Sequence, residues 1–212
     1  SEEKMGLHAS PTCVINFENS IGWRVGDLHD GMPLMFQMMN RERLATGMMG
    51  IGLAEIAYQN ALSWVKDRRQ GRDLNGIKDP NHKADNILVH PDVGRMLLEA
   101  KVNNEGCRAL ATWTGLLLDQ VKSEDNKESE RAQALLDLFT PIVKAHFTDL
   151  GCETVSTCMQ VMGGAGYCSE YGVEQFYRDV RISKIWEGTN GIQALDLAGR
   201  KITQNMGKNL RY

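Results

Sequence analysis

Glu187 is the residue whose surroundings in the sequence point most directly to chemistry. It lies between the bulky apolar pair Ile185–Trp186 and the chain-breaking Gly188, and Thr189–Asn190 can cap a helix that starts at Gly191. Apolar neighbours remove water from a carboxylate and so favour its uptake of a proton, which a general base requires near neutral pH. The same residues also suit an exposed loop glutamate ahead of a helix, so this segment alone leaves both interpretations open.

Two arginines and a glycine-rich turn are candidates for binding anions. Arg43 lies in N-R-E-R-L-A-T-G and Arg68 in W-V-K-D-R-R-Q-G-R, and a guanidinium pairs with carboxylates and phosphates through charge-assisted hydrogen bonds. In Q-V-M-G-G-A-G-Y, Gly163 and Gly164 allow the backbone to approach an anion because glycine has no Cβ. Each feature also has a simpler explanation: an exposed helix charge for Arg43, a complement to a helix C-terminus for Arg68, and a helix-ending turn for the glycines.

Long helical patterns must position these groups. Apolar residues recur at helical spacing through three long segments, and shorter patterns follow toward the C-terminus. The predicted helices cover Pro33 to about Arg68, a start near His90 and Pro91 to about Val121, about Arg131 to Met162, Val173–Val180, and Gly191 to about Ile202. Such patterns joined by polar loops, of which residues 71–86 are the clearest, predict a mainly α protein built as an up-and-down bundle of about four helices.

Some residues within these patterns carry predictions of their own. Gly47, Gly50 and Gly52 would each weaken the first helix by about 1 kcal/mol, so we expect them where that helix packs closely against a neighbour or a ligand. Pro141 is expected to kink the third helix. His146 lies on the apolar face of the same helix, where a hydrogen-bonded core or interface histidine is favoured over a ligand or base.

The first 31 residues do not have the composition of a self-sufficient domain. Residues 12–17, T-C-V-I-N-F, alternate like a short β-strand, but one strand cannot bury a face. We therefore expect residues 1–31 to be a remnant of a β-domain with its connection, and residues 32–212 to form the helical domain.

The composition argues against several classes of partner and site. The chain has 212 residues and a net charge of -3, so neither nucleic acid nor an anionic membrane is an expected partner. No apolar run approaches the roughly 20 residues of a membrane span, and the polar N-terminus has no signal-peptide core, which predicts a cytoplasmic protein. The 5 cysteines include no C-x-x-C pair, so neither a disulfide framework nor a zinc site is predicted, and we interpret them as reduced packing residues.

Several of these motifs occur together in the order found in one known family. W-E-G-T-N-G-I-Q-A-L-D-L, around Glu187, resembles the catalytic segment of the flavin-dependent acyl-CoA dehydrogenases, and the motifs around Arg68 and Gly163 resemble that family's diphosphate-binding motifs. The resemblance extends from Cys13 to about Arg200 and implies a C-terminal helical domain preceded by the end of a middle β-domain, so we expect a fragment. F-Q-M-M-N-R-E-R-L and I-W-E-G-T-N-G-I-Q are most similar to a long bacterial branch that includes the 3-methylmercaptopropionyl-CoA dehydrogenases.

The resemblance also implies an activity and roles for individual residues. The reaction would convert an acyl-CoA thioester to the 2,3-enoyl-CoA, with Glu187 removing the α-proton, FAD accepting the β-hydride and an electron-transfer flavoprotein taking the electrons. Arg68 would bind the FAD diphosphate of a neighbouring subunit in a homodimer or homotetramer. The other implied site residues are Arg43, Asn40 and Trp186 at the substrate, and Gln160, Gly163, Gly164, Thr189 and Gly191 at the cofactor.

Two further expectations follow from the resemblance. Because most of the flavin-binding β-domain is absent, we expect the isolated fragment to bind FAD poorly and to be inactive. The alternative, from a different class of function, is a helical oligomerisation or binding module on the same scaffold without catalysis of its own.

Overall fold

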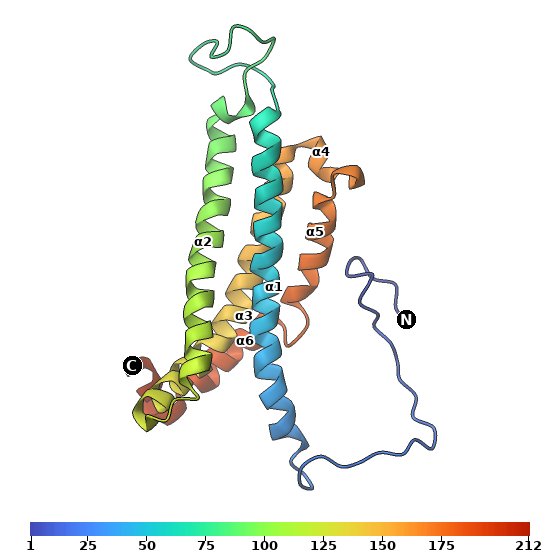
Figure 1. Cartoon of the computed structure of the whole chain (residues 1–212), viewed down its shortest axis with the longest axis vertical. Helices are drawn as coiled ribbons and strands as arrows, with labels where there is room; N and C mark the ends of the chain where they lie inside the picture. The colour runs from blue at the N-terminus through green and yellow to red at the C-terminus, as the bar shows by residue number, and fades with distance from the viewer.

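The computed structural model describes residues 1–212 and is built from helices, with no β-strand. Three long helices, α1 (Gly31–Asp67), α2 (Pro91–Gln120) and α3 (Asn126–Met162), run side by side along the length of the molecule (Figure 1). The prediction of a mainly α protein is confirmed. The shorter elements are the α-helices α4 (Gly164–Tyr167), α5 (Val173–Val180) and α6 (Asn190–Asp196), the 3-10 turns η1 (Ile87–Val89), η2 (Ser169–Tyr171), η3 (Arg181–Lys184) and η5 (Gln204–Arg211), and the π-helical turn η4 (Leu197–Lys201).

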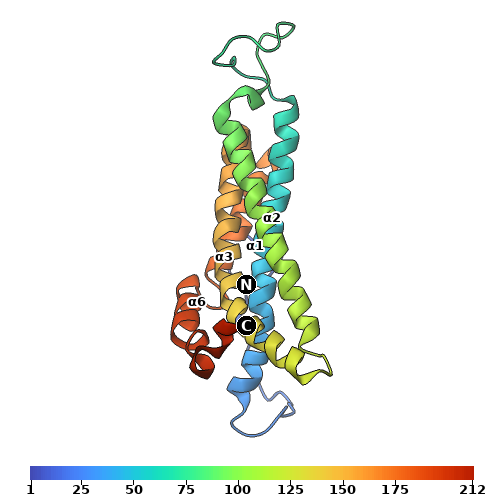
Figure 2. The same ribbon diagram turned by 90° about the vertical axis from the view of Figure 1, so that its left-hand side faces the viewer.

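The fourth side of the bundle is occupied by short helices instead of a fourth long one. α5 packs beside α1 and α3, and α6 crosses the lower part of α3, as the turned view in Figure 2 shows. The main core lies between these elements and combines small residues of α1 with larger apolar residues of the other helices. Its central members are Ala54, Ala57, Ala61, Val65, Met96, Leu97, Ala100, Val155, Cys158, Val173 and Val180.

Glycines allow α1 and α3 to approach each other closely. A Cβ at Gly50 would lie 2.8 Å from the carbonyl oxygen of Phe147, and one at Gly151 would lie 2.7 Å from the carbonyl oxygen of Gly50. Gly47 faces Val143 in the same way, at 2.9 Å. The prediction of close packing is therefore confirmed at Gly47 and Gly50, but it is wrong at Gly52, which is exposed and has open space where a Cβ would be.

Local signals explain where α2 and α3 begin and end. Pro91 is the first residue of α2, a position that needs no backbone N–H donor. α3 starts earlier than predicted because the carboxylate of Asp125 caps it by accepting a hydrogen bond from the Lys127 amide. α3 continues through the buried Pro141 and ends at Gly163, whose φ of 61° and ψ of -141° are accessible to glycine.

His146 does not lie in the core. Its side chain is exposed, whereas Val143 and Phe147 on either side of it are buried. Because successive residues of an α-helix are about 100° apart, the face of α3 that carries Phe147 points inward while His146 points toward solvent. The core part of the prediction for His146 is therefore wrong, while an interface position stays a prediction.

The segment before α1 has no regular secondary structure. The strand predicted over residues 12–17 is absent, because no second strand lies beside it to complete a backbone ladder. Residues 11–30 are exposed and run outside the bundle to the start of α1 (Figure 1). The first few residues contact α5: the Leu7 amide donates to Asp179 at 2.7 Å, and Arg178 donates to the carbonyl oxygen of Met5 at 2.9 Å.

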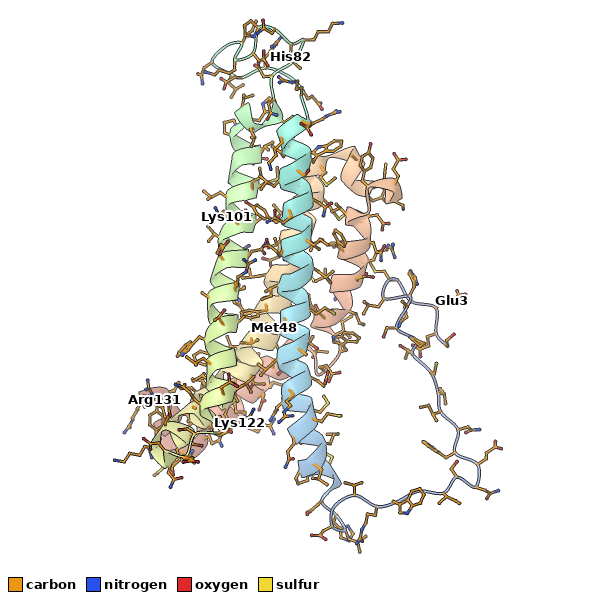
Figure 3. All side chains as sticks on the ribbon, viewed as in Figure 1. Glu3, Met48, His82, Lys101, Lys122 and Arg131 are labelled. Carbon is orange, nitrogen blue, oxygen red and sulfur yellow. The ribbon has the colours of Figure 1, made fainter.

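The connection between α1 and α2 is organised around one buried carboxylate, Asp85. Its oxygens accept hydrogen bonds from the backbone amides of Asp73, Lys78 and Asp79 and from the guanidinium of Arg72, at 2.7 to 3.3 Å. Burial of Asp85 opposes ionisation, but these donors outweigh it and hold the pKa of the carboxyl well below its usual range. The loop projects from the end of the bundle, with His82 in its outer part (Figure 3).

Two predictions about composition can be compared with the fold. None of the helices combines the length and apolar composition needed to cross a bilayer. The cysteines form no disulfide, but only Cys107, Cys152 and Cys158 pack in the interior, where burial raises the pKa of Cys107 to about 11 and that of Cys158 to about 12. Cys13 and Cys168 are exposed, so the packing interpretation is wrong for these two.

Candidate active site

Glu187 lies in a sharp turn between η3 and α6. Its φ is 56°, in the left-handed region that a residue with a Cβ rarely adopts, and Gly188 follows with a φ of 85°. Thr189 then caps α6 as predicted, its hydroxyl oxygen accepting from the Ile192 amide at 3.4 Å. A strained backbone at a lone carboxylate is the kind of outlier that occurs at functional sites.

Two buried side chains hold this turn through its carbonyl groups. Arg43 donates from Nε to the carbonyl oxygen of Glu187 at 3.3 Å, and Gln193 donates from Nε2 to the same oxygen at 3.3 Å. Gln193 also donates to the carbonyl oxygen of Gly188 at 3.0 Å. These three hydrogen bonds fix the direction of the backbone at Glu187 and offset the cost of its left-handed conformation.

Arg43, expected from the resemblance at the substrate, lies close to Glu187, but its contact is to the backbone. The guanidinium of Arg43 pairs with the carboxylate of Asp196 at 3.4 Å, and Arg200 approaches the other oxygen of Asp196 at 2.7 Å. The carboxylate of Glu187 has no hydrogen bond or ion pair within the chain and is partly exposed. Asp196 and Gln193 were not among the predicted site residues, and only the Ile-Gln pair of the family motif pointed toward Gln193.

A second set of polar contacts joins the turn at Glu187 to α3. Lys144 is buried and donates from Nζ to Oδ1 of Asn190 at 2.8 Å. Nδ2 of Asn190 donates to Oγ1 of Thr148 at 3.0 Å and to the carbonyl oxygen of Ala145 at 3.2 Å. No motif predicted these contacts, because Lys144 and Thr148 fit an ordinary helical pattern.

The remaining predicted residues of this region lie near the turn with fewer contacts. Trp186 is half-buried, and its Nε1 is buried without a hydrogen-bond partner. Asn40 is half-buried on α1, one helical turn before Arg43, and its side chain makes no hydrogen bond within the chain. Gly191, in the first turn of α6, is exposed with open space on its Cβ side apart from the Thr189 hydroxyl at 3.9 Å.

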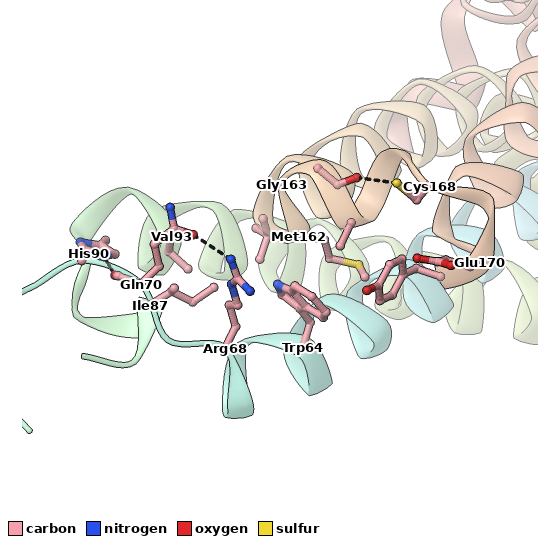
Figure 4. Close-up of a pocket in the computed structure, with 15 residues that line it drawn as sticks. Trp64, Arg68, Gln70, Ile87, His90, Val93, Met162, Gly163, Cys168 and Glu170 are labelled. Carbon is pink, nitrogen blue, oxygen red and sulfur yellow. Dashed lines mark hydrogen bonds between the residues drawn. The ribbon is translucent and has the colours of Figure 1, made fainter. Parts of the chain in front are cut away.

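Three predicted cofactor residues meet at the opposite end of the bundle. Arg68 at the end of α1 and Gly163 and Gly164 after α3 line one cavity of about 660 Å³ (Figure 4). The guanidinium of Arg68 lies over the ring of Trp64, 5.7 Å from its centroid, and donates to the Gln70 side chain at 3.0 Å. The other lining residues are Trp64, Gln70, Gly71, Ile87, His90, Val93, Val161, Met162, Ala165, Cys168, Glu170 and Tyr171.

The chemical character of this cavity suits an anion. No carboxylate lies within ion-pair distance of Arg68, and a Cβ at Gly163 or Gly164 would meet no other atom within 4 Å. The guanidinium and the open glycine turn are therefore both accessible from the cavity. Gln160, the remaining predicted cofactor residue, is exposed but does not line the cavity; its carbonyl oxygen accepts from the Gly163 amide at 3.0 Å.

The two groups of residues are far apart along α1. Arg43 and Arg68 are 25 positions apart in the sequence, which corresponds to about 38 Å along a helix axis. Within a single copy of the chain, the cavity at Arg68 therefore lies far from the turn at Glu187.

Comparison with known protein families finds a match over most of the chain. The family model for the acyl-CoA dehydrogenase C-terminal domain matches residues 29–202. This chain belongs to the acyl-CoA dehydrogenase family. The predicted resemblance of the chain to this family is thereby confirmed.

Relatives with assigned names cover nearly the whole chain. It is 43% identical over 210 residues to 3-methylmercaptopropionyl-CoA dehydrogenase of Ruegeria pomeroyi, an alignment that covers 99% of this chain and 35% of that protein. It is 38% identical over 216 residues to a butyryl-CoA dehydrogenase of Syntrophomonas wolfei, covering 98% of this chain and 35% of the relative. The chain thus spans about a third of the length of the curated relatives that it matches.

The fold is also shared with solved members of the family. Butyryl-CoA dehydrogenase from Megasphaera elsdenii superposes with a TM-score of 0.65 at 22% identity, over 82% of this chain and 39% of that one. At this identity, the similarity establishes the helical fold.

Proposed function

We propose that this chain is the part of a flavin-dependent acyl-CoA dehydrogenase that carries the catalytic base, Glu187. The observation that carries the proposal is the hydrogen bonding of the turn: Arg43 and Gln193 hold the backbone carbonyl of Glu187, and its carboxylate is left without a partner in the chain. A fixed carboxylate without competing donors is suited to remove a proton.

In the proposed reaction, Glu187 takes the α-proton of an acyl-CoA thioester, and the electrons of that C–H bond form the α,β double bond. FAD, when bound, accepts the hydride that leaves the β-carbon, so the product is the 2,3-enoyl-CoA. Arg43 and Gln193 orient the base, and Asn40 and Trp186 contribute to the substrate side of the site. The unpaired, buried Nε1 of Trp186 is a hydrogen-bond donor available there.

The residues at the far cavity fit the diphosphate of FAD. The guanidinium of Arg68 has no carboxylate partner, and the turn at Gly163 and Gly164 has no side chain that would block a phosphate. Because about 38 Å of helix separates Arg68 from Arg43, we propose that this cavity serves an FAD whose flavin lies in the active site of another copy. We propose that Gln160 also contributes to binding this diphosphate. Thr189 and Gly191 are proposed to lie toward the flavin that is bound in the active site of their own copy of the chain.

This arrangement requires partners. We propose a homodimer or homotetramer, an electron-transfer flavoprotein as electron acceptor and a cytoplasmic location.

Residues 1–31 are proposed to be the end of the family's middle β-domain, with residues 32–212 as the helical domain, since the family match starts at residue 29. The isolated chain of 212 residues is then expected to bind FAD poorly and to be inactive. Ordinary FAD content and turnover by the isolated chain would contradict this point.

The proposal is tested in the full-length protein that carries this chain, by following the bleaching of bound flavin with a panel of acyl-CoA thioesters. We expect one thioester class to reduce the flavin, and the Glu187→Gln variant to slow reduction by at least about 100-fold with FAD still bound. Arg68→Ala should weaken FAD binding by roughly 10-fold or more, while Arg95→Ala on the exposed face of α2 should not.

The outcomes separate the two classes of function. Equal bleaching by the parent and Glu187→Gln would mean that another residue is the base. A parent protein that binds FAD but is reduced by no acyl-CoA would favour the alternative, a helical oligomerisation or binding module without catalysis.

A further inference from the structure

Lys144 has an environment that is unusual for a lysine. It lies on α3 with none of its surface exposed, and no carboxylate is within ion-pair distance of its ammonium group. Its one hydrogen bond within the chain is the 2.8 Å contact from Nζ to Asn190. Burying an ammonium without a counter-ion is costly, so a lysine kept at such a position requires an explanation.

The partner of Lys144 connects it to the turn that carries Glu187. Asn190 is the first residue of α6, three positions after Glu187. Besides Lys144, it is held by Oγ1 of Thr148 at 3.0 Å and by the carbonyl oxygen of Ala145 at 3.2 Å. All three groups come from α3, so Asn190 connects the C-terminal end of the turn to α3. At the other end of the turn, Arg43 of α1 donates a hydrogen bond to the backbone carbonyl oxygen of Glu187.

Charged groups from three parts of the chain act on Lys144. Burial is the main reason that the pKa of Lys144 is lowered, to about 8; Asp149 on its own helix and Glu187 on the turn act in the opposite direction, and Arg43 on α1 acts in the same direction as burial. At neutral pH the group is therefore mostly an ammonium, and its hydrogen bond to Asn190 is charge-assisted.

We propose that Lys144 is a positioning residue for Glu187, acting through Asn190 to fix the turn between η3 and α6. This proposal rests on the proposed function for its catalytic consequence, although the structural part can be tested separately. Lys144 is not assigned a contact with substrate or cofactor.

The first test measures hydrogen–deuterium exchange in the turn and does not depend on catalysis. In the full-length protein, we compare hydrogen–deuterium exchange of the peptide covering residues 185–196 in Lys144→Met with that in Lys101→Met, whose lysine is exposed on the outer side of α2 (Figure 3). We expect faster exchange in this peptide alone for Lys144→Met, with a melting temperature equal to or above that of the parent, because methionine fills the same space without a buried charge. Unchanged exchange at 185–196, or faster exchange throughout with a lower melting temperature, would overturn the proposal.

The second test is kinetic and uses a double-mutant cycle. Lys144→Met should lower kcat for flavin reduction by roughly 10-fold or more with KM nearly unchanged, because it displaces the base and leaves substrate binding intact. Asn190→Ala removes this contact together with those to Thr148 and Ala145, so its effect should be at least as large, and the double variant should be no worse than Asn190→Ala alone. Unchanged kcat, or effects that add fully, would overturn the assignment.

Glu187→Gln, measured beside these variants, separates this proposal from the proposed function. If the parent protein reduces no flavin with acyl-CoA, the proposed function fails, and the exchange measurement still decides whether Lys144 positions the turn.

Discussion

Arg43 donates its hydrogen bond to the backbone carbonyl oxygen of Glu187, 3.3 Å away, and forms its ion pair with Asp196 at 3.4 Å. The cation therefore fixes where the glutamate is without neutralising its carboxylate. A direct ion pair would have stabilised the ionised form and weakened the group as a base.

Replacing Arg43 is expected to cost stability as well as activity. Arg43→Met leaves the buried Asp196 with Arg200 as its single charged partner and removes a donor from the Glu187 carbonyl, so we expect a loss of about 2–3 kcal/mol in the free energy of unfolding. Urea denaturation at pH 7 measures this loss. Arg41→Met, two residues away and exposed, should change stability by less than about 0.5 kcal/mol, and equal losses for the two variants would count against the buried pair.

Gly188 is expected to tolerate no side chain. Its φ of 85° is unfavourable for alanine, and a Cβ there would lie 2.8 Å from Nε2 of Gln193. Gly188→Ala should therefore destabilise the protein by about 1–3 kcal/mol. The matched control is Gly115→Ala in α2, where a Cβ meets nothing and helix propensity should improve stability by up to about 1 kcal/mol. Thermal unfolding followed by circular dichroism would show opposite shifts, and shifts of the same sign would refute the geometric argument.

Two glycines of α1 that are two positions apart should respond in opposite ways to alanine. At Gly50 the added methyl would collide with the backbone of α3 at 2.8 Å and force the helices apart, at a cost of about 2 kcal/mol. At Gly52 it points into open space and should stabilise the helix by about 0.5–1 kcal/mol. Chemical denaturation of both variants tests this, and a stable Gly50→Ala protein would mean that α1 and α3 are not in close contact.

The loop between α1 and α2 should depend on pH through Asp85. Because its pKa is depressed in the folded state, ionised Asp85 contributes stability that is fully present above the unfolded value of about 3.9 and is lost as the pH falls toward the folded value. We expect hydrogen exchange of residues 71–86, corrected for intrinsic rates, to stay slow at pH 7 and pH 5 and to accelerate below about pH 4. Asp85→Asn should exchange fast already at pH 7, unlike Asp92→Asn at an exposed carboxylate. Slow loop exchange in Asp85→Asn would contradict this account.

Helical periodicity was sufficient to predict the long helices of this fold. The predicted ends at Arg68, Pro91 and Met162 agree with the observed ends to within one residue, because proline, glycine and loop residues mark them. The start of α3 was missed by five residues, because the charged stretch before Arg131 looks like a solvated loop while Asp125 caps it as a helix. The strand over residues 12–17 was wrong, because strand formation depends on a partner that no local pattern can supply.

The polar contacts of the candidate site were harder to predict. Motif resemblance indicated Glu187, Arg43, Arg68 and the glycine turn, and the structure brings Arg68 and that turn to one cavity. The buried Lys144 and Asp196 were missed, because their burial results from α6 folding back against α3, more than 40 positions away in the sequence for Lys144 and Asn190. Periodicity reports which face of one helix is apolar, but not which polar residues a distant segment will cover.

Arg43 lies in the first half of α1 and Arg68 directly follows its last residue, so the uninterrupted helix sets the distance between the two regions. Adding or removing a single residue between them would change their separation by about 1.5 Å and rotate one arginine by about 100° relative to the other. A substitution on the helix surface leaves the separation and the relative rotation of the two arginines unchanged. If Arg43 and Arg68 act as proposed, insertions or deletions in α1 should be far less tolerable than in the loop of residues 71–86.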